Sequence, residues 1–436
     1  MQADEHFDAY REQVSQNVRR NFSLNALDGV LFTFGFAFIE SASVLPAFVR
    51  RLGASDFLIS IIPAAHALGW MTPQVFISNF VERLRRKKPY VLAVGAWERL
   101  PFLFVIGVCF LLGNSHPTVL LAVSLGAVFT TAVAFGFVNP AWFDLVAKVT
   151  PIRRRGKLSA LKMGLGTLLG IGAGWIVAWV LGHSQLPFPQ NYGWLFVMAF
   201  FFMSLSLVSL AFIREPVRAF RTKKVKLRDY LSTLPTILKE DRNFRNFLAA
   251  TFLQRATIIA VAFYAINALE KFALPDEWVG SFTVSIMFGR LVSTPVFGLL
   301  GDRFGHKINM VVGSVAHLAA AIVAMVAPNE WWYLPAFALV SVGFSSNEVS
   351  RFNMVVEFCE ARRRPTYVAL SNSLLGPIGF IALLGGGLVN VLGYDGLFAI
   401  AGSFALASAF CMIFAVREPR KVSGTRMAPT YDGHFE

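Results

Sequence analysis

Two long apolar runs of the sequence flank the stretch Gly298-Leu299-Leu300-Gly301-Asp302-Arg303-Phe304-Gly305-His306-Lys307. About 220 residues earlier the chain contains a related stretch, Ser78-Asn79-Phe80-Val81-Glu82-Arg83-Leu84-Arg85-Arg86-Lys87. Three further matches occur in the same order: Asn25 with Asn246, Asn139-Pro140 with Asn347-Glu348, and Arg153–Arg155 with Arg362–Arg364. One such match can arise by chance between apolar segments, but four in order predict a chain built from two related halves.

The composition is that of a membrane protein. Of the 436 residues, 55% are hydrophobic and 15% are charged, whereas soluble domains carry about 25% charged residues. A bilayer core about 30 Å thick is crossed by about 20 apolar residues in helical form, and a backbone in lipid must satisfy its own hydrogen bonds. These rules predict twelve membrane-spanning helices, near residues 25–48, 56–80, 90–112, 118–147, 157–182, 194–213, 246–270, 278–300, 308–327, 332–358, 366–392 and 395–416.

The basic residues predict the orientation of these helices. Most of the 40 Lys and Arg residues fall in alternate connections, the same side as both termini, and the opposite loops hold Arg50, Arg51 and Lys271. Because Lys and Arg concentrate on the cytoplasmic side of membrane proteins, we expect both termini to be cytoplasmic, in a multi-pass protein of a bacterial-type inner membrane. The net charge of +14 is therefore interpreted as attraction to anionic lipid, and nucleic-acid binding is not indicated.

The same pattern divides the chain into segments. We expect a cytoplasmic segment at 1–20, a six-helix bundle at 21–213, a cytoplasmic linker at 214–242, a second bundle at 243–416 and a cytoplasmic tail at 417–436. Within the linker, Leu227–Lys239 is interpreted either as a helix along the membrane surface or as a solvated connection.

The stretch that contains Gly298, Asp302, Arg303, Gly305 and Lys307 resembles the signature loop of the major facilitator superfamily. The resemblance implies an all-α integral membrane protein with twelve transmembrane helices in two pseudo-symmetric six-helix bundles. The first copy departs from the family pattern, because Ser78 and Arg85 stand where glycines are usual and Glu82 replaces the aspartate.

A cytoplasmic gate is the role that the resemblance implies for both loops. Glycine permits a tight turn and close helix approach, and the acid can pair with a base of the neighbouring bundle. Such pairs would hold the cytoplasmic ends together in one state and break in the other. The alternative is that these residues set only loop topology and charge. The expected gate residues are Glu82, Arg83, Gly298, Asp302, Arg303, Gly305 and Lys307.

Ionisable residues within membrane helices are costly and mark functional candidates. Glu40 in the first helix suits proton binding or recognition of a cation, and Arg255 in the seventh needs an acidic partner or an anionic ligand. Glu348 and Arg351 are three residues apart in the tenth helix and share a face, so they are candidates for an internal ion pair. In the resembled family, helices 1, 4, 7 and 10 line the cavity. Each candidate can instead be structural.

Other polar residues complete the candidate list. Asn139 and Asn347 are expected to hydrogen-bond a ligand, whereas Glu98-Arg99, Arg290 and His66 are expected to be structural. Asp28 is expected to lie near enough to the cytoplasmic end to be hydrated. Glycines in helices 5 and 11 are expected to allow close packing between the bundles.

These features together predict a proton-coupled secondary transporter of a small organic or amphipathic solute, with export favoured over uptake. A lipid flippase, a solute importer, and a non-transporting sensor or scaffold are the alternatives. Three cysteines without paired spacing, and the lack of a phosphate-binding loop, a metal-ligand cluster or a catalytic triad, favour a non-enzyme without cofactor or metal. The expected partners are a small-molecule substrate, a proton or other coupling ion and the lipid bilayer, and we expect a monomer.

Overall fold

The computed structural model describes residues 2–217, 237–359 and 363–422. In this part of the chain the regular structure is helical. The first half contains α1 (Gln2–Ala37), α2 (Val44–Arg51), α3 (Asp56–Arg83), α4 (Lys88–Leu111), α5 (Pro117–Val149), α6 (Ile152–Gly182) and α7 (Gln190–Ala211). The second contains α9 (Arg242–Ala256), α10 (Val261–Lys271), α11 (Trp278–Phe304), α12 (His306–Val326), α13 (Tyr333–Glu357), α14 (Arg364–Leu375), α15 (Ile378–Phe410) and α16 (Pro419–Val422).

The lengths and composition of these helices are those of a membrane protein. Within the described residues, eight segments are long and apolar enough to cross a bilayer. One of them, Thr366–Ala415, covers most of α14 and all of α15, and Gly393 (φ 69°) divides α15 into two parts with a left-handed backbone that glycine adopts readily. Helices α1, α3 and α13 have 36, 28 and 25 residues. The described helices are therefore consistent with the twelve predicted crossings.

The predicted helix at 25–48 is wrong in its bounds. Helix α1 begins at Gln2, ends at Ala37, and resumes as α2 at Val44. Helix α9 is likewise interrupted before α10 by the 3-10 turn Thr257–Ala260. Both interruptions lie at corresponding places in the two halves, so the first helix of each half is broken. Most of the predicted linker and tail, including most of Leu227–Lys239, lies outside the described residues.

The two halves pack in the same manner. In the first, α3 and α4 both pack on α5, and α4 packs on α7; in the second, α11 and α12 both pack on α13, and α12 packs on α15. The halves contact each other through α6 against α11 and α3 against α15. This is the predicted architecture of two pseudo-symmetric helical bundles.

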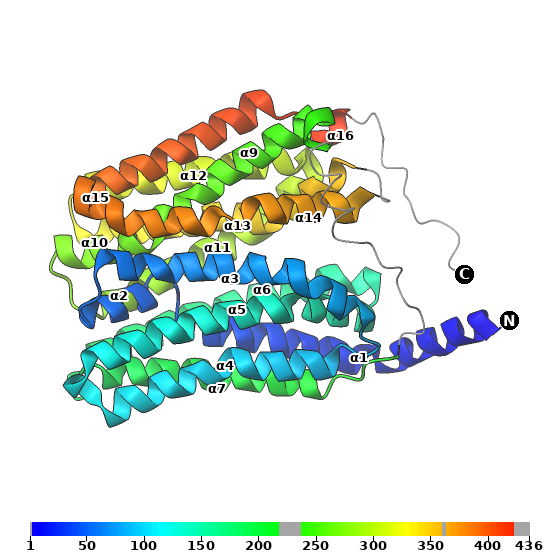
Figure 1. Ribbon diagram of the computed structural model, residues 1–436, viewed down its shortest axis with the longest axis horizontal. Helices are drawn as coiled ribbons and strands as arrows, with labels where there is room; N and C mark the ends of the chain where they lie inside the picture. Colours follow the sequence, from blue (N-terminus) through cyan, green and yellow to red (C-terminus); the bar gives the residue numbers. More distant parts are fainter. Residues whose placement is uncertain (1, 218–236, 360–362, 423–436) are drawn as a thin grey trace.

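Small residues permit the contact between bundles. A β-carbon on Gly280 would lie 2.3 Å from the backbone nitrogen of Ala178, and one on Gly386 would lie 2.3 Å from the carbonyl oxygen of Asp56. The predicted role of glycine between the bundles is confirmed for Gly174, Gly379 and Gly386, whereas Gly385 packs on Ile259 of its own bundle and Gly164, Gly172 and Gly387 face open space. Figure 1 shows the bundles meeting near α2 and α10 and lying farther apart at the end that carries both chain termini. We call these the far end and the termini end.

Candidate functional site

Polar side chains from α9 and α13 meet on the inner side of the second bundle. The Arg255 guanidinium, from α9, donates through Nη1 to Oδ1 of Asn347 on α13 at 3.2 Å. The Asn347 amide in turn donates to Oε1 of Gln254 at 3.1 Å. Arg255 and Asn347, both predicted site residues, are therefore brought into contact. Nε of Arg255 is buried and has no hydrogen-bond partner in the described structure.

The predicted ion pair between Glu348 and Arg351 does not form. Glu348 instead lies 3.5 Å from Nη2 of Arg290 on α11. Nη1 of Arg351 donates to Oδ1 of Asn372 at 2.9 Å and to Oγ of Ser371 at 3.3 Å. The prediction fails because α11 and α14 supply nearer partners than α13 itself does.

The first bundle contributes Glu40 and His66 to this region. Glu40 lies in the break between α1 and α2, is 4% exposed, and has one carboxylate oxygen without a hydrogen-bond partner in the described structure. It is close enough to Arg290 for their charges to interact. His66 of α3 is likewise close enough to Arg290 and Arg255 for their charges to act on it. Charged and titratable groups of both bundles therefore converge within the membrane-spanning region.

Aromatic rings continue from His66 along the inner side of the first bundle. The ring centroids of His66 and Trp70 are 5.7 Å apart, those of Trp70 and Phe135 are 5.1 Å apart, and those of Phe135 and Phe32 are 6.0 Å apart. Phe36 lies next to both His66 and Phe32. All five rings are partly exposed. We call this set the aromatic wall; the sequence signalled it only through the abundance of phenylalanine.

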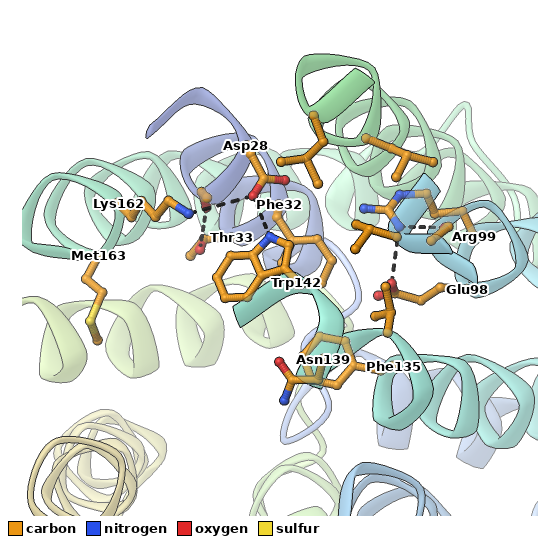
Figure 2. A pocket seen from close by; sticks show the side chains of 16 residues that line it. Asp28, Phe32, Thr33, Glu98, Arg99, Phe135, Asn139, Trp142, Lys162 and Met163 are labelled. Carbon is orange, nitrogen blue, oxygen red and sulfur yellow. Dashed lines mark hydrogen bonds and ion pairs between the residues drawn. The ribbon is translucent and has the colours of Figure 1, made fainter. Parts of the chain in front are cut away.

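A cavity of about 230 Å³ lies within the first bundle, between α1, α4, α5, α6 and α7. Figure 2 shows Asp28 and Lys162 beside Trp142, with the Glu98–Arg99 pair on its other side. Asp28 accepts from Nε1 of Trp142 at 3.0 Å and lies 3.7 Å from Nζ of Lys162. Asp28 is 3% exposed, so the prediction that it is hydrated is wrong.

Three other residues singled out in the sequence, Glu98, Arg99 and Asn139, also line this cavity. Glu98 and Arg99 form a buried ion pair at 3.2 Å, and Arg99 also donates to the carbonyl oxygens of Met203 and Gly95, as expected of structural residues. Asn139, predicted to bind a ligand, lines this cavity and is 5% exposed.

Four of the predicted gate residues at the termini end, Glu82, Arg83, Asp302 and Arg303, show no ion pair between the bundles in the described structure. Glu82, Arg83, Asp302 and Arg303 are all exposed. Nζ of Lys307 donates to the carbonyl oxygens of Ile413 and Val416, within its own bundle.

Gly305 and Gly298 differ in their surroundings. Gly305 has φ 93°, and a β-carbon there would lie 2.5 Å from Cδ of Glu418, so the predicted need for glycine is confirmed. Gly298 faces open space, so close packing does not explain it in this conformation.

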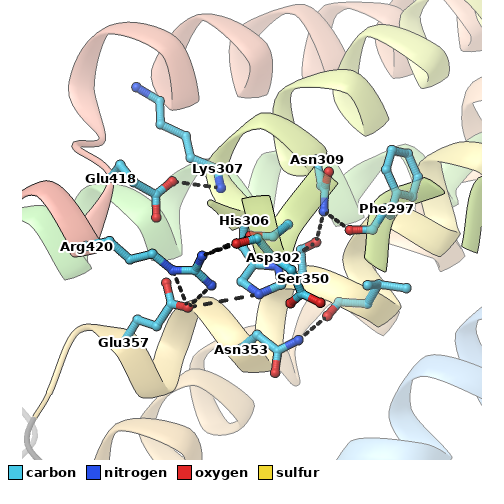
Figure 3. A network of polar contacts seen from close by, with 12 residues as sticks. Phe297, Asp302, His306, Lys307, Asn309, Ser350, Asn353, Glu357, Glu418 and Arg420 are labelled. Atoms are coloured by element: carbon cyan, nitrogen blue, oxygen red, sulfur yellow. Dashed lines mark hydrogen bonds and ion pairs between the residues drawn. The ribbon is translucent and has the colours of Figure 1, made fainter. Parts of the chain in front are cut away.

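Figure 3 shows what holds the loop between α11 and α12 in place. Glu418 accepts from the backbone N–H of Lys307, near the N-terminus of α12, where the helix dipole favours a carboxylate. Burial raises the pKa of the Glu418 carboxyl. Arg420 donates to Glu357 at 2.6 Å and to the carbonyl oxygen of Asp302 at 3.0 Å, and the Glu357 carboxylate raises the pKa of Arg420.

The first bundle repeats this arrangement with Glu215. Its carboxylate accepts from the backbone N–H groups of Lys87 and Lys88 at 2.8 and 2.9 Å, at the start of α4. It also pairs with Lys148 at 2.8 Å, with both side chains 2% exposed. Glu215 and Glu418 are the central residues of two identical tripeptides, Arg214-Glu215-Pro216 and Arg417-Glu418-Pro419. The identical tripeptides signalled this repeat in the sequence, but it was not predicted.

Ion pairs and a hydrogen bond join the bundles at the far end. Nε of Arg50 on α2 donates to Glu270 on α10 at 2.6 Å, and Arg51 lies 2.9 Å from Asp276. The hydroxyl of Ser43, just before α2, lies 2.8 Å from the hydroxyl of Thr283 on α11. We call Arg50, Arg51, Glu270 and Asp276 the far-end latch. Arg50 and Arg51 were predicted to lie in loops on the side of the membrane opposite the termini, but their acidic partners were not predicted.

The comparisons with known proteins agree with this fold. Residues 247–429 match the model of the Major Facilitator Superfamily. The quinolone resistance protein NorA of Staphylococcus aureus is 21% identical over 69% of this chain and 73% of its own length. Multidrug resistance protein 2 of Bacillus subtilis is 22% identical over 82% of this chain and 86% of its own. The crystal structure of a D-xylose-proton symporter superposes with a TM-score of 0.68 at 14% identity, covering 92% of this chain and 98% of the other.

Proposed function

Because residues 247–429 match the Major Facilitator Superfamily, we propose that the chain is a secondary transporter of this family that moves a small organic or amphipathic solute by alternating access, coupled to protons. The observation that carries the proposal is the unequal closure of the two ends. Ion pairs of the far-end latch cross between the bundles, whereas the described residues show no such pair at the termini end. An arrangement closed at one end only is one of the two states that alternating access requires.

We place the termini in the cytoplasm because basic residues concentrate on that side. The described conformation is then inward-facing, and the far-end latch is the outer gate. Glu82, Arg83, Asp302 and Arg303 would form the inner gate in the other state, which is consistent with their exposure here. We propose that the protein acts as a monomer in the cell membrane.

Proton coupling is supported by Glu40. It is a buried carboxyl with an unpartnered oxygen, set in a helix break and near Arg290 of the other bundle. A carboxyl in this position can exchange a proton while its environment changes between states, because each state alters the nearby positive charge. Export is supported by the names of two relatives, which are resistance proteins.

The test uses proteoliposomes with a pH-sensitive dye inside and an imposed pH gradient. The probes are 2-naphthoate, 2-naphthamide and 2-naphthylmethylamine, which share one aromatic body and differ in charge. We expect at least one probe to be exchanged across the membrane together with protons. Glu40→Gln should retain exchange of that probe and lose the dependence on the pH gradient.

Glu240→Gln is the matched control, because Glu240 is exposed at the termini end. It should behave as the wild type. If none of the three probes is exchanged across the membrane, the result would contradict the transporter proposal. Exchange by Glu40→Gln with an unchanged response to pH would remove Glu40 from the coupling mechanism.

A further inference from the structure

We propose that the solute is an aromatic organic anion, whose acidic group binds between Arg255 and Arg351 while its ring lies against the aromatic wall. This inference rests on the proposed transport function and names the substrate class for it.

Unequal charge on the inner side of the second bundle is the first argument. Arg255, Arg290 and Arg351 bring three positive charges there, and Glu348 brings one negative charge. Arg290 lies 3.5 Å from Glu348 and is also near Glu40. Arg255 and Arg351 have no carboxylate within ion-pair distance in the described structure. The charge of Glu348 acts on Arg255 from farther away, and with Glu348 and Glu40 both counted the region keeps an excess of one positive charge. We call Arg255 and Arg351 the surplus arginines.

The surplus arginines are held by neutral groups. Arg255 donates to the Asn347 side chain, and Arg351 donates to Asn372 and Ser371. Nε of Arg255 and Nε of Arg290 remain buried without partners in the described structure. A buried donor on a charged group costs free energy while it is unpaired. The N–H groups at Nε of Arg255 and Nε of Arg290 are therefore available to donate hydrogen bonds to a ligand.

Electrostatics defines the chemistry of that ligand. Arg255 and Arg351 are close enough for their like charges to interact, and mutual repulsion within a membrane protein is unfavourable. An anion between them would remove the repulsion. The planar guanidinium group matches a carboxylate or phosphate in particular, because it can donate two parallel hydrogen bonds to it.

The aromatic wall defines the rest of the ligand. His66 is close enough to Arg255 and Arg290 for their charges to act on it, so the ring series that starts at His66 begins near the arginines. Trp70, Phe135 and Phe32 present partly exposed rings at centroid spacings of 5.1 and 6.0 Å. Aromatic faces bind an aromatic ring in stacked or edge-to-face arrangements. A ligand with an acidic head and an aromatic body matches both surfaces.

Such a ligand would bridge the two bundles. Its head would bind α9 and α13 of the second bundle, and its body would bind α1, α3 and α5 of the first. Binding would then favour the approach of the bundles at the termini end, which is the movement that alternating access needs. Substrate recognition and conformational change would be linked through the same contacts.

The experiment measures binding to the purified full chain in a neutral detergent. The thermal unfolding midpoint is followed during titration with 2-naphthoate, 2-naphthamide and 2-naphthylmethylamine. We expect saturable stabilisation by the acid and none by the amide or the amine. Arg255→Gln and Arg351→Gln should each weaken the acid's apparent affinity by about tenfold or more, the loss of one charge-assisted hydrogen bond.

Arg242→Gln is the matched control, because it removes the same charge from an exposed position at the start of α9. It should bind the acid as the wild type does. The unliganded Arg255→Gln and Arg351→Gln proteins should unfold at or above the wild-type midpoint, since each relieves a like-charge contact. That result separates lost binding from misfolding.

An anionic head group can also come from a lipid. A second titration therefore compares short-chain phosphatidylglycerol with phosphatidylcholine. Stabilisation by phosphatidylglycerol that depends on both arginines would support the anion site and assign it to a lipid. Failure of every anion to stabilise the wild type, or equal binding of the acid by wild type and both arginine variants, would overturn the proposal.

The outcome for transport is read separately. Exchange of the amine or amide but not the acid in proteoliposomes would leave the transporter in place and refute the anion. Arginine-dependent binding of the acid without exchange of any probe would support the site and contradict transport.

Discussion

Removing Arg50 should open the far end. In the described conformation Nε of Arg50 donates to Glu270 across the two bundles at 2.6 Å, and its bond to the Tyr394 hydroxyl is long, at 3.4 Å. The Arg50 and Glu270 side chains are 32% and 40% exposed, so water and salt screen the pair. A screened pair of this kind contributes up to about 1 kcal/mol. In the Arg50→Gln variant the far end opens without breaking this pair. The fraction of molecules whose far end is open should therefore rise about fivefold, the factor that corresponds to about 1 kcal/mol.

Ser43 supplies the reporter for this measurement. It is fully buried where its hydroxyl meets Thr283 of the other bundle. A Ser43→Cys protein that lacks the three native cysteines should react with an impermeant maleimide only when the far end opens. The labelling rate should rise about fivefold in Arg50→Gln, in line with the open fraction. It should rise in wild type when the ionic strength is raised, because salt weakens an exposed ion pair.

A double-mutant cycle isolates the pair. Glu270→Gln alone should increase labelling about as much as Arg50→Gln, and the double variant should add little to either. Arg154→Gln, an exposed charge change at the termini end, is the control and should leave the rate unchanged. Labelling that is equal in wild type and Arg50→Gln would refute the assignment of this ion pair as a gate.

The remaining predictions concern the loops at the termini end. Glu215→Gln should lower the unfolding midpoint more than Glu418→Gln, because it removes the carboxylate that pairs with the buried Lys148 as well as a helix cap, whereas Glu418→Gln removes a helix cap worth about 1 kcal/mol; equal shifts would contradict this. Gly305→Ala should be destabilising by about 1 kcal/mol or more, from the positive φ and the contact with Glu418, whereas Gly298→Ala, in open space, should be neutral. Asp302→Asn should reduce far-end labelling if Asp302 stabilises the outward-facing state, and increased labelling would exclude that role.

The sequence predicted the membrane fold well because hydrophobic length is a local property. Each crossing needs about 20 apolar residues wherever it lies in the chain, so the bounds of α5 at Pro117–Val149 and of α13 at Tyr333–Glu357 followed closely from composition. The break at residues 38–43 was missed, because apolar length shows that a segment can cross the membrane and does not show where its helix is interrupted.

Which charges pair with each other could not be predicted in the same way. The spacing of Glu348 and Arg351 along α13 favoured a local pair, yet Arg290 and Asn372 from other helices lie closer. Hydrogen-bond partners depend on packing between helices that are distant in sequence, and a single sequence carries no record of it. The exception is a feature that both halves repeat, such as the pairs formed by Glu215 and Glu418.

The two halves also differ in a way that carries information about the solute. Gly69 and Gly289 correspond in the repeat, and both are tightly packed against the neighbouring helix, on Ala132 and Ala338. The residue that follows is Trp70 in the first half and Arg290 in the second.

A second pair of positions shows the same contrast. Four residues after Asn139 the first half has Phe143, and four residues after Asn347 the second half has Arg351. Positions that set helix packing have therefore stayed alike, while positions beside them are aromatic in one bundle and cationic in the other. The shared fold lets both halves move as rigid bodies. The solute would then be recognised by the side chains that differ between the halves, which are aromatic in the first bundle and cationic in the second. An aromatic acid is the ligand that needs both kinds of surface at once.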